Sequence, residues 1–197
     1  MQFDHFEIVG IAIEAGLSIM DVYDSSVQIE VQSKEDDSPL TKADIAAHKT
    51  IIRGLSTINP EVPVVSEEGR VGDPKKSELA WLVDPLDGTK EFIKRNGMFT
   101  VNIALMKRMG PQWKPIFGVV HAPVNRTTWF GGVDVPATKI TDAETSEISV
   151  KKQTSTQPRL VASGSHRAER DEKFAKELGD HELSLIHISE PTRRTPI

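Results

Sequence analysis

The sequence contains no cysteine among its 197 residues. This absence excludes disulfide bridges, thiolate metal sites and a cysteine nucleophile. Positive charge is also scarce, because 24 Lys and Arg residues face 29 Asp and Glu residues and leave a net charge of -5. Binding to nucleic acid or to anionic lipid requires clustered positive charge, so we expect neither kind of partner.

Long apolar runs are missing too, since none approaches the roughly 20 residues that a membrane-spanning helix needs. The opening stretch MQFDHFEIVGIAIEAG carries acids inside its apolar pattern, which is typical of an amphipathic helix and not of a signal peptide. We therefore expect a cytoplasmic protein with no integral membrane segment. The rest of the composition is globular, with 38% hydrophobic and 27% charged residues, and the chain is long enough to bury a core.

The order of the expected elements favours a layered α+β domain followed by the start of a second unit. Apolar residues at three- and four-residue spacing predict a helix over residues 4–23, and a second helix is expected from about Thr41 to the Asn59-Pro60 pair. A third helix is expected over residues 166–179, with Gly179 as its stop. Strands are expected at residues 27–31, 62–66, 79–83, 98–106, 115–123, 127–133 and 159–163, and a Gly- and Pro-rich loop at residues 67–78.

Four acidic residues follow expected strands. Glu67 and Glu68 come after the strand at residues 62–66, and Asp84 and Asp87 come after the strand at residues 79–83. The end of a strand is a common place for site residues, because the scaffold is rigid and the turn is exposed. If the second segment opens a helix, its two aspartates lie about 5 to 6 Å apart on one side.

Such a pair of aspartates could span a two-metal site, and oxygen ligands select hard cations such as Mg²⁺. Gly88 and Thr89 would then stand at the start of a helix, where free N–H groups favour a phosphate. Metal ligands next to backbone N–H groups that can bind a phosphate predict an enzyme that hydrolyses a phosphoester.

Each of these features also has a plain structural interpretation. Asp-Pro and Asp-Gly pairs are common turn formers, and the Glu67-Glu68 pair alone is typical of a solvated loop. Asp44, three residues after Thr41, fits an ordinary helix capping box. Lys90 fits the wet face of a helix. The features indicate a site only when they are taken together and in order.

Taken together they match a known family. The segments PLTKADIAAH, VPVVSEEG, WLVDPLDGTKEFIKRNGMFTVNIAL and GVVHAPV, in that order, resemble the inositol monophosphatase superfamily of lithium-sensitive, Mg²⁺-dependent phosphatases. The resemblance covers residues 1–180 and is strongest to the bacterial 3'(2'),5'-bisphosphate nucleotidase branch. It implies an inositol monophosphatase-like, five-layered αβαβα sandwich and a small-molecule nucleotide bisphosphate as substrate. The implied reaction turns adenosine 3',5'-bisphosphate into AMP and phosphate, in support of sulfate assimilation.

The resemblance also implies which residues hold the metal. Glu67 and Asp84 would share one Mg²⁺, to which Leu86 adds its backbone carbonyl. Asp84 and Asp87 would share a second, and two or three ions would bind in all. The implied chemistry is an in-line attack of water on phosphorus, with no covalent phosphoenzyme.

Catalytic and substrate-binding roles follow from the same resemblance. Thr89 and Glu67 would position and deprotonate the attacking water, and Asp44 would support the site through a hydroxyl group. We interpret three histidines, His5, His48 and His121, as structural. The residues implied in substrate binding are Asp87, Gly88, Thr89, Lys90, Ser165 and His166.

Two parts of the family pattern do not occur in this sequence. One is a third aspartate in a Trp-Asp helix start, which completes the second metal site, and the other is a Ser-Ser-Leu-Lys segment that binds the second phosphate. From residue 183 the chain continues LSLIHISEPTRRTPI, which is similar to a translated transposon-end adapter from sequencing libraries. We therefore expect a metal-binding catalytic domain at residues 1–155, the start of a truncated α/β domain at 156–182, and a non-native tail at 183–197. A divergent native tail is the alternative.

We expect the parent protein to be a phosphomonoesterase and this fragment to be inactive. The nearest alternatives are an inositol-1-phosphate phosphatase and a fructose-1,6-bisphosphate phosphatase of the same superfamily. A non-catalytic metal- or nucleotide-binding module is an alternative of a different class, and an interaction domain with incidental turn aspartates is another. The oligomeric state is not indicated by any pattern in the sequence.

Overall fold

The computed structural model describes residues 4–25, 39–150, 159–163, 169–179 and 182–186. The chain divides into two compact units, Met1–Ile148 and Ser149–Ile197. The expected strand at residues 27–31 and the expected domain boundary at residue 155 lie outside the described residues, so the division into domains stays a prediction.

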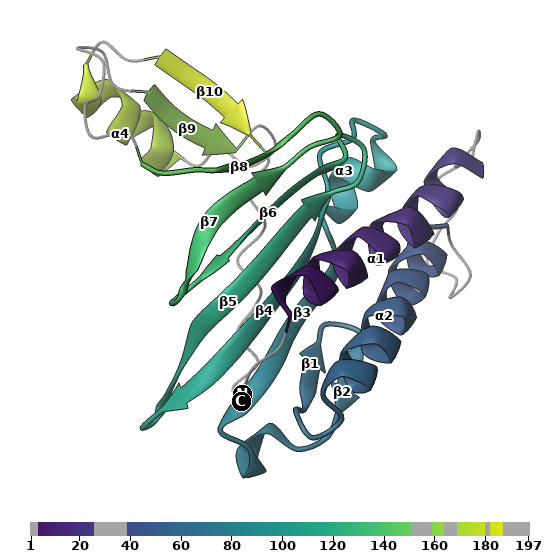
Figure 1. Ribbon diagram of the computed structural model, residues 1–197. Coiled ribbons are helices and arrows are strands. Elements are labelled where there is room, and N and C mark those ends of the chain that lie inside the picture. Colours follow the sequence, from purple (N-terminus) through teal and green to yellow (C-terminus); the bar gives the residue numbers. More distant parts are fainter. Residues whose placement is uncertain (1–3, 26–38, 151–158, 164–168, 180–181, 187–197) are drawn as a thin grey trace. The chain divides into compact units, whose positions relative to one another are not determined.

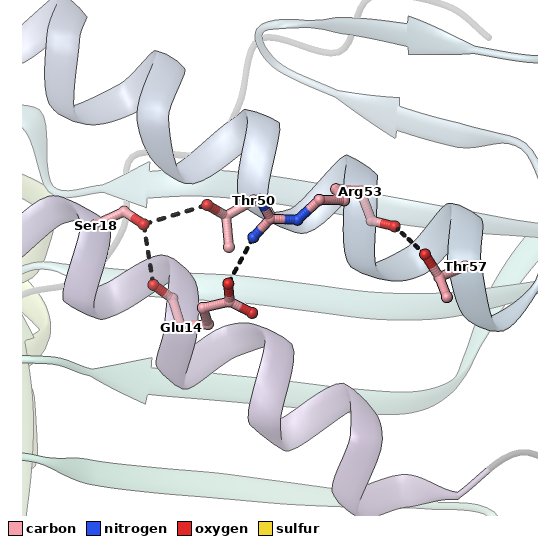
Figure 2. A network of polar contacts seen from close by, with 5 residues as sticks. All are labelled: Glu14, Ser18, Thr50, Arg53 and Thr57. Atoms are coloured by element: carbon pink, nitrogen blue, oxygen red, sulfur yellow. Dashed lines mark hydrogen bonds and ion pairs between the residues drawn. The ribbon is translucent and has the colours of Figure 1, made fainter.

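Two long helices open the first unit, α1 (His5–Ser25) and α2 (Pro39–Ile58). Both confirm the expected helices, and α2 ends before Pro60, which has no N–H to continue the hydrogen-bond ladder. Figure 2 shows the polar contacts that join the two helices. Arg53 Nη2 donates to Glu14 Oε1 at 2.6 Å, and Ser18 Oγ lies 3.2 Å from Thr50 Oγ1.

An eight-stranded sheet follows, in the order β2-β1-β3-β4-β5-β6-β7-β8. Strands β1 and β3 are parallel, and every other neighbouring pair in this sheet is antiparallel. The antiparallel hairpins expected after residue 98 are therefore confirmed. The strands are β1 (Val64–Ser66), β2 (Gly69–Val71), β3 (Leu79–Asp87), β4 (Thr100–Met109), β5 (Gln112–Ala122), β6 (Thr127–Gly132), β7 (Val135–Ile140) and β8 (Thr145–Glu147).

Several elements of the sheet differ from the expectation. The segment 67–78, expected as a loop, contains β2 and a short 3-10 helix, η1 (Pro74–Lys76). Asp73 caps η1 by accepting a hydrogen bond from the Lys75 N–H at 3.0 Å. Strands β7 and β8 were not expected, because their residues are mostly polar or half-exposed and the apolar alternation that marks a strand is weak there.

The helices α1 and α2 cover one face of the sheet, as Figure 1 shows, and the core lies between them. Gly16 lets α1 approach β5 closely, because a Cβ atom at this position would lie 2.6 Å from His121 Cδ2. Strand residues that alternate with the core positions point to the opposite face, where Leu82 and Val120 are 45% and 40% exposed. The largest fully buried side chains include Ile8, Ile19, Ile51, Leu55, Trp81, Phe92, Phe99 and Ile103.

The second unit contains a parallel pair of strands, β9 (Arg159–Ser163) and β10 (Glu182–Ile186), with α4 (Glu169–Leu178) between them in the chain. The expected strand and helix are confirmed, and Gly179 ends α4 in the left-handed region at φ 73°. Strand β10 falls mostly within the residues expected to be a non-native tail, whose origin stays a prediction. None of the helices in the described part of the chain combines the length and apolar character needed to cross a bilayer.

Candidate active site

The parallel pairing of β1 with β3 brings two acidic segments to the same end of the sheet. Ser66 lies opposite Val83 in this ladder, and the Glu67 N–H donates to the Val83 carbonyl at 3.3 Å. The residues that follow, Glu67 after the end of β1 and Asp84 within β3, therefore lie next to each other. A strand-to-strand register, and not closeness in the sequence, assembles this part of the site.

Asp84 and Asp87 lie in an irregular part of β3 and not in a helix. Asp84 pairs with Asn102 and Asp87 pairs with Thr100, so β3 advances three residues while β4 advances two. One extra residue in one strand is a β-bulge. In a regular strand, residues three apart would face opposite sides of the sheet, whereas the bulge turns both aspartates to the same side. The expected helical spacing of this pair is thus wrong, although the two carboxylates do come together.

Helix α2 adds Asp44 to the cluster. The Asp44 carboxyl forms a hydrogen bond with Glu68 and feels the charges of Asp84 and Glu67. One turn further along α2, His48 Nδ1 lies 3.0 Å from Ser66 Oγ, which ties the helix to the end of β1. Helix α2 is therefore held where its acid faces the strand ends.

The cluster raises the pKa of three of its carboxyl groups. Burial, then the charges of Glu68 and Asp84, raises the pKa of Asp44 to about 8. Burial, then the charges of Glu67 and Asp87, raises the pKa of Asp84 to about 7, against a smaller lowering by the Leu86 backbone N–H. Burial and the charges of Asp87 and Glu68 also raise the pKa of Glu67. The raised pKa makes Asp44 easier to protonate than a free aspartate, and two carboxyl groups can share a hydrogen bond only when one of them carries a proton.

The chemistry of this donor set fits a hard divalent cation. All of the groups are oxygen donors, and the Oδ1 atoms of Asp44 and Asp84 are buried without a hydrogen-bond partner. Within the described residues, no group of three His, Asp or Glu side chains is arranged closely enough to hold a metal ion as they stand. Like charges repel one another, and a divalent cation is the partner that would draw them together.

The segment after the bulge confirms the expected placement of the glycine and threonine. Helix α3 (Thr89–Ile93) begins at Thr89, and Gly88 precedes it as N-cap in the left-handed region at φ 101°. Thr89 and Lys90 are exposed beside the cluster in sequence. Phosphate binding by these groups stays a prediction.

Two expected site residues remain, together with the three histidines interpreted as structural. Ser165 and His166 lie outside the described residues. His121 is buried, its Nδ1 lies 2.8 Å from Thr128 Oγ1, and burial lowers its pKa to about 4, which agrees with a structural role. His48 bonds to Ser66 beside the cluster, and the His5 ring packs on Phe117.

Two residues near the cluster were not assigned a role from the sequence. Glu68 was noted only as an acid after a strand, yet it is the direct partner of Asp44. Asn102 Nδ2 donates to Asp87 Oδ2 at 3.0 Å. The alternating pattern of β4 places Asn102 on the face away from the core, but the pairing that brings it beside Asp84 is not visible in one sequence.

Comparison with known proteins identifies the family to which the chain is similar. The family model described as the inositol monophosphatase family matches residues 4–193. The 3'(2'),5'-bisphosphate nucleotidase CysQ of Salmonella typhimurium is 43% identical over 193 residues, and that of Escherichia coli is 44% identical over 189 residues. In each case the match covers 93% of this chain and 72% of the relative.

Solved structures give the corresponding result for the fold. The crystal structure of CysQ from Bacteroides thetaiotaomicron, a bacterial member of the inositol monophosphatase family, matches with a TM-score of 0.75 at 31% identity. The match covers 93% of this chain and 72% of the Bacteroides thetaiotaomicron chain. Inositol monophosphatase II from Staphylococcus aureus matches with a TM-score of 0.69 at 19% identity, which shows the fold alone.

Proposed function

The chain belongs to the inositol monophosphatase family, and on that premise we propose that the parent protein is a Mg²⁺-dependent 3'(2'),5'-bisphosphate nucleotidase. The proposed substrate is adenosine 3',5'-bisphosphate and the products are AMP and phosphate. The observation that carries the proposal is the set of five carboxylates, contributed by α2, β1 and β3, whose mutual repulsion a divalent cation would relieve. Relatives called nucleotidases at 43% and 44% identity support the choice of substrate.

We assign the metal to the ligands expected from the sequence. Glu67, Asp84 and Asp87 would hold two or three Mg²⁺ ions, with the backbone carbonyl of Leu86. When bound, Mg²⁺ would supply positive charge to the phosphate oxygens and make water more acidic. The buried, unpaired Oδ1 of Asp84 supports this role, since a buried carboxylate oxygen without a partner is costly.

Residues of the chain would orient the water and the phosphate. Glu67, whose raised pKa brings it nearer to the range of a general base, would accept the proton of the attacking water with the help of Thr89. Gly88, Thr89 and Lys90 would bind the phosphate, because the first two offer backbone N–H groups and Lys90 offers a positive charge. Asp44, hydrogen-bonded to Glu68, would support the cluster from α2. Ser165 and His166 stay a prediction for substrate contact.

A side-by-side assay tests the proposed function. Phosphate release is measured from adenosine 3',5'-bisphosphate, inositol 1-phosphate and fructose 1,6-bisphosphate, with Mg²⁺ and with excess EDTA. The assay uses the 197-residue chain and a form extended by the carboxy-terminal part of a CysQ relative. We expect the extended form to prefer the nucleotide and to lose activity in EDTA.

Other outcomes separate the alternatives. Faster release from inositol 1-phosphate or fructose 1,6-bisphosphate would assign a sugar-phosphate phosphatase instead. Stoichiometric nucleotide binding without turnover in the extended form would favour a binding module. Full activity after chelation would contradict the role given to the carboxylates.

A further inference from the structure

Asn102 on β4 joins the two ends of the bulge that carries the site aspartates. Its backbone pairs with Asp84 in the β3–β4 ladder, while its side-chain Nδ2 donates to Asp87 Oδ2 at 3.0 Å. Pro85, between the two aspartates, has no N–H to offer to the ladder. A side-chain hydrogen bond therefore crosses the two strands where the regular backbone pairing is interrupted.

The orientation of the Asn102 amide follows from the chemistry of its two neighbours. Thr100 Oγ1 donates to Asn102 Oδ1 at 3.2 Å, and the Asp87 carboxylate can only accept. Only one orientation of the amide satisfies both contacts, with its oxygen toward the hydroxyl and its nitrogen toward the carboxylate. The Asp87 carboxylate thus fixes the direction in which Asn102 donates, and the hydrogen bond from Thr100 holds the amide in that orientation.

The hydrogen bond from Asn102 to Asp87 is placed to orient the Asp87 carboxylate. Asp87 is only 9% exposed, and a hydrogen bond from an amide to a carboxylate is shorter and stronger than one between neutral groups. It engages one carboxylate oxygen, Oδ2. A carboxylate anchored through one oxygen presents the other in a defined direction, as hydrogen-bonded metal ligands commonly do.

We infer that Asn102, held by Thr100, is a positioning residue that orients the Asp87 carboxylate toward a bound divalent cation. The inference rests on the proposed function, because it takes Asp87 as a metal ligand. Asn102 acts through Asp87 and touches neither the substrate nor the reacting atoms.

The test measures Mg²⁺ binding by calorimetry on the 197-residue chain, with no substrate present. We expect Asn102→Ala to weaken Mg²⁺ binding by about 10- to 100-fold. Thr100→Val removes the hydroxyl with little change of shape and is expected to weaken binding less, whereas Thr100→Ser keeps the hydroxyl and should bind like the parent. Asn125→Asp, in the exposed turn before β6, is the matched control and should also bind like the parent.

A second measurement separates positioning from a merely structural role. Thermal unfolding of each variant in EDTA reports the stability of the fold alone. In the extended form, Asn102→Ala should raise the Mg²⁺ concentration that gives half-maximal activity. The KM for the nucleotide at saturating Mg²⁺ should stay within about twofold of the parent value. Unchanged Mg²⁺ affinity in both Asn102→Ala and Thr100→Val would overturn the inference, as would a parent chain that binds no Mg²⁺. If Asn102→Ala does not fold, Thr100→Val against Thr100→Ser decides. Normal Mg²⁺ binding by the parent without nucleotide hydrolysis would overturn only the proposed function.

Discussion

Replacing Asp84 with asparagine should stabilise the metal-free chain at alkaline pH. Burial and the charges of Glu67 and Asp87 raise the pKa of Asp84 from 3.8 to about 7. The folded state therefore binds the proton more tightly than the unfolded state, and stability falls as the pH rises between these two values. Above pH 7 the ionised carboxyl costs about 4 kcal/mol, at about 1.4 kcal/mol for each tenfold change in proton affinity.

The expected gain from Asp84→Asn is smaller than this cost, because the amide is buried without a full set of partners. An unpaired buried amide costs about 1 to 3 kcal/mol, which leaves a net gain of about 2 kcal/mol at pH 8. At pH 5 the folded Asp84 carboxyl is protonated, and taking up that proton on folding costs about 1 to 2 kcal/mol, which the cost of the unpaired amide offsets. The variant and the parent should then be about equally stable.

The assay is urea unfolding in EDTA at pH 8 and pH 5, followed by tryptophan fluorescence, to which Trp81 contributes from the core, where it is 2% exposed. Added Mg²⁺ should raise the unfolding midpoint of the parent and leave that of Asp84→Asn nearly unchanged. Asp134→Asn, on an exposed turn, is the control and should show neither effect. A variant no more stable than the parent at pH 8 in EDTA would refute the reasoning that repulsion and burial strain this cluster.

Three further predictions concern the scaffold. Gly16→Ala should destabilise the chain by about 1 to 3 kcal/mol in urea unfolding, since its Cβ would lie 2.6 Å from His121 Cδ2. Gly10→Ala, where a Cβ meets nothing within 4 Å, should stabilise the chain by up to about 1 kcal/mol. Equal effects at both positions would contradict the close packing of α1 on β5. The His121 imidazole, with its pKa lowered to about 4 by burial, should stay neutral in NMR titration down to pH 5, and stability should fall as the pH drops from 6.5 toward 4; titration near 6.5 would show that the ring is solvated. Arg53 and Glu14 should couple by less than about 1 kcal/mol in a double-mutant cycle, because their side chains are 70% and 58% exposed, and a coupling above about 2 kcal/mol would contradict this.

Local patterns in the sequence were enough to place most elements. The three- and four-residue apolar period of α1 and the Asn59-Pro60 stop of α2 are properties of short windows, and the structure agrees with both. The apolar strands β3 to β6 were also expected, for the same reason. The polar strands β7 and β8 carry little of that signal and were missed.

The composition of the acidic cluster was largely predictable, but its geometry was not. The segment from Asp84 to Asp87 has Pro and Gly signals that suit a helix start as well as a bulge, and only the pairing with β4 decides between them. The raised pKa of Asp44 depends on burial and on the carboxyl groups that α2 meets at the end of β1, which a single sequence does not report. Long-range pairing is therefore the information that was lacking.

The bulge in β3 also determines which mutations could remove a backbone ligand from the proposed metal site. The extra residue of a bulge lies outside the regular ladder, so its backbone carbonyl oxygen need not accept a hydrogen bond from the neighbouring strand. If Leu86 lends such an oxygen to a cation, as proposed, no exchange of its side chain can take that ligand away. Leu86→Ile would alter packing, since the side chain is 2% exposed, yet would leave the carbonyl in place. Only an insertion or deletion between the two aspartates could remove this carbonyl ligand. At this position the spacing of the residues therefore determines metal binding, and the identity of the side chain does not.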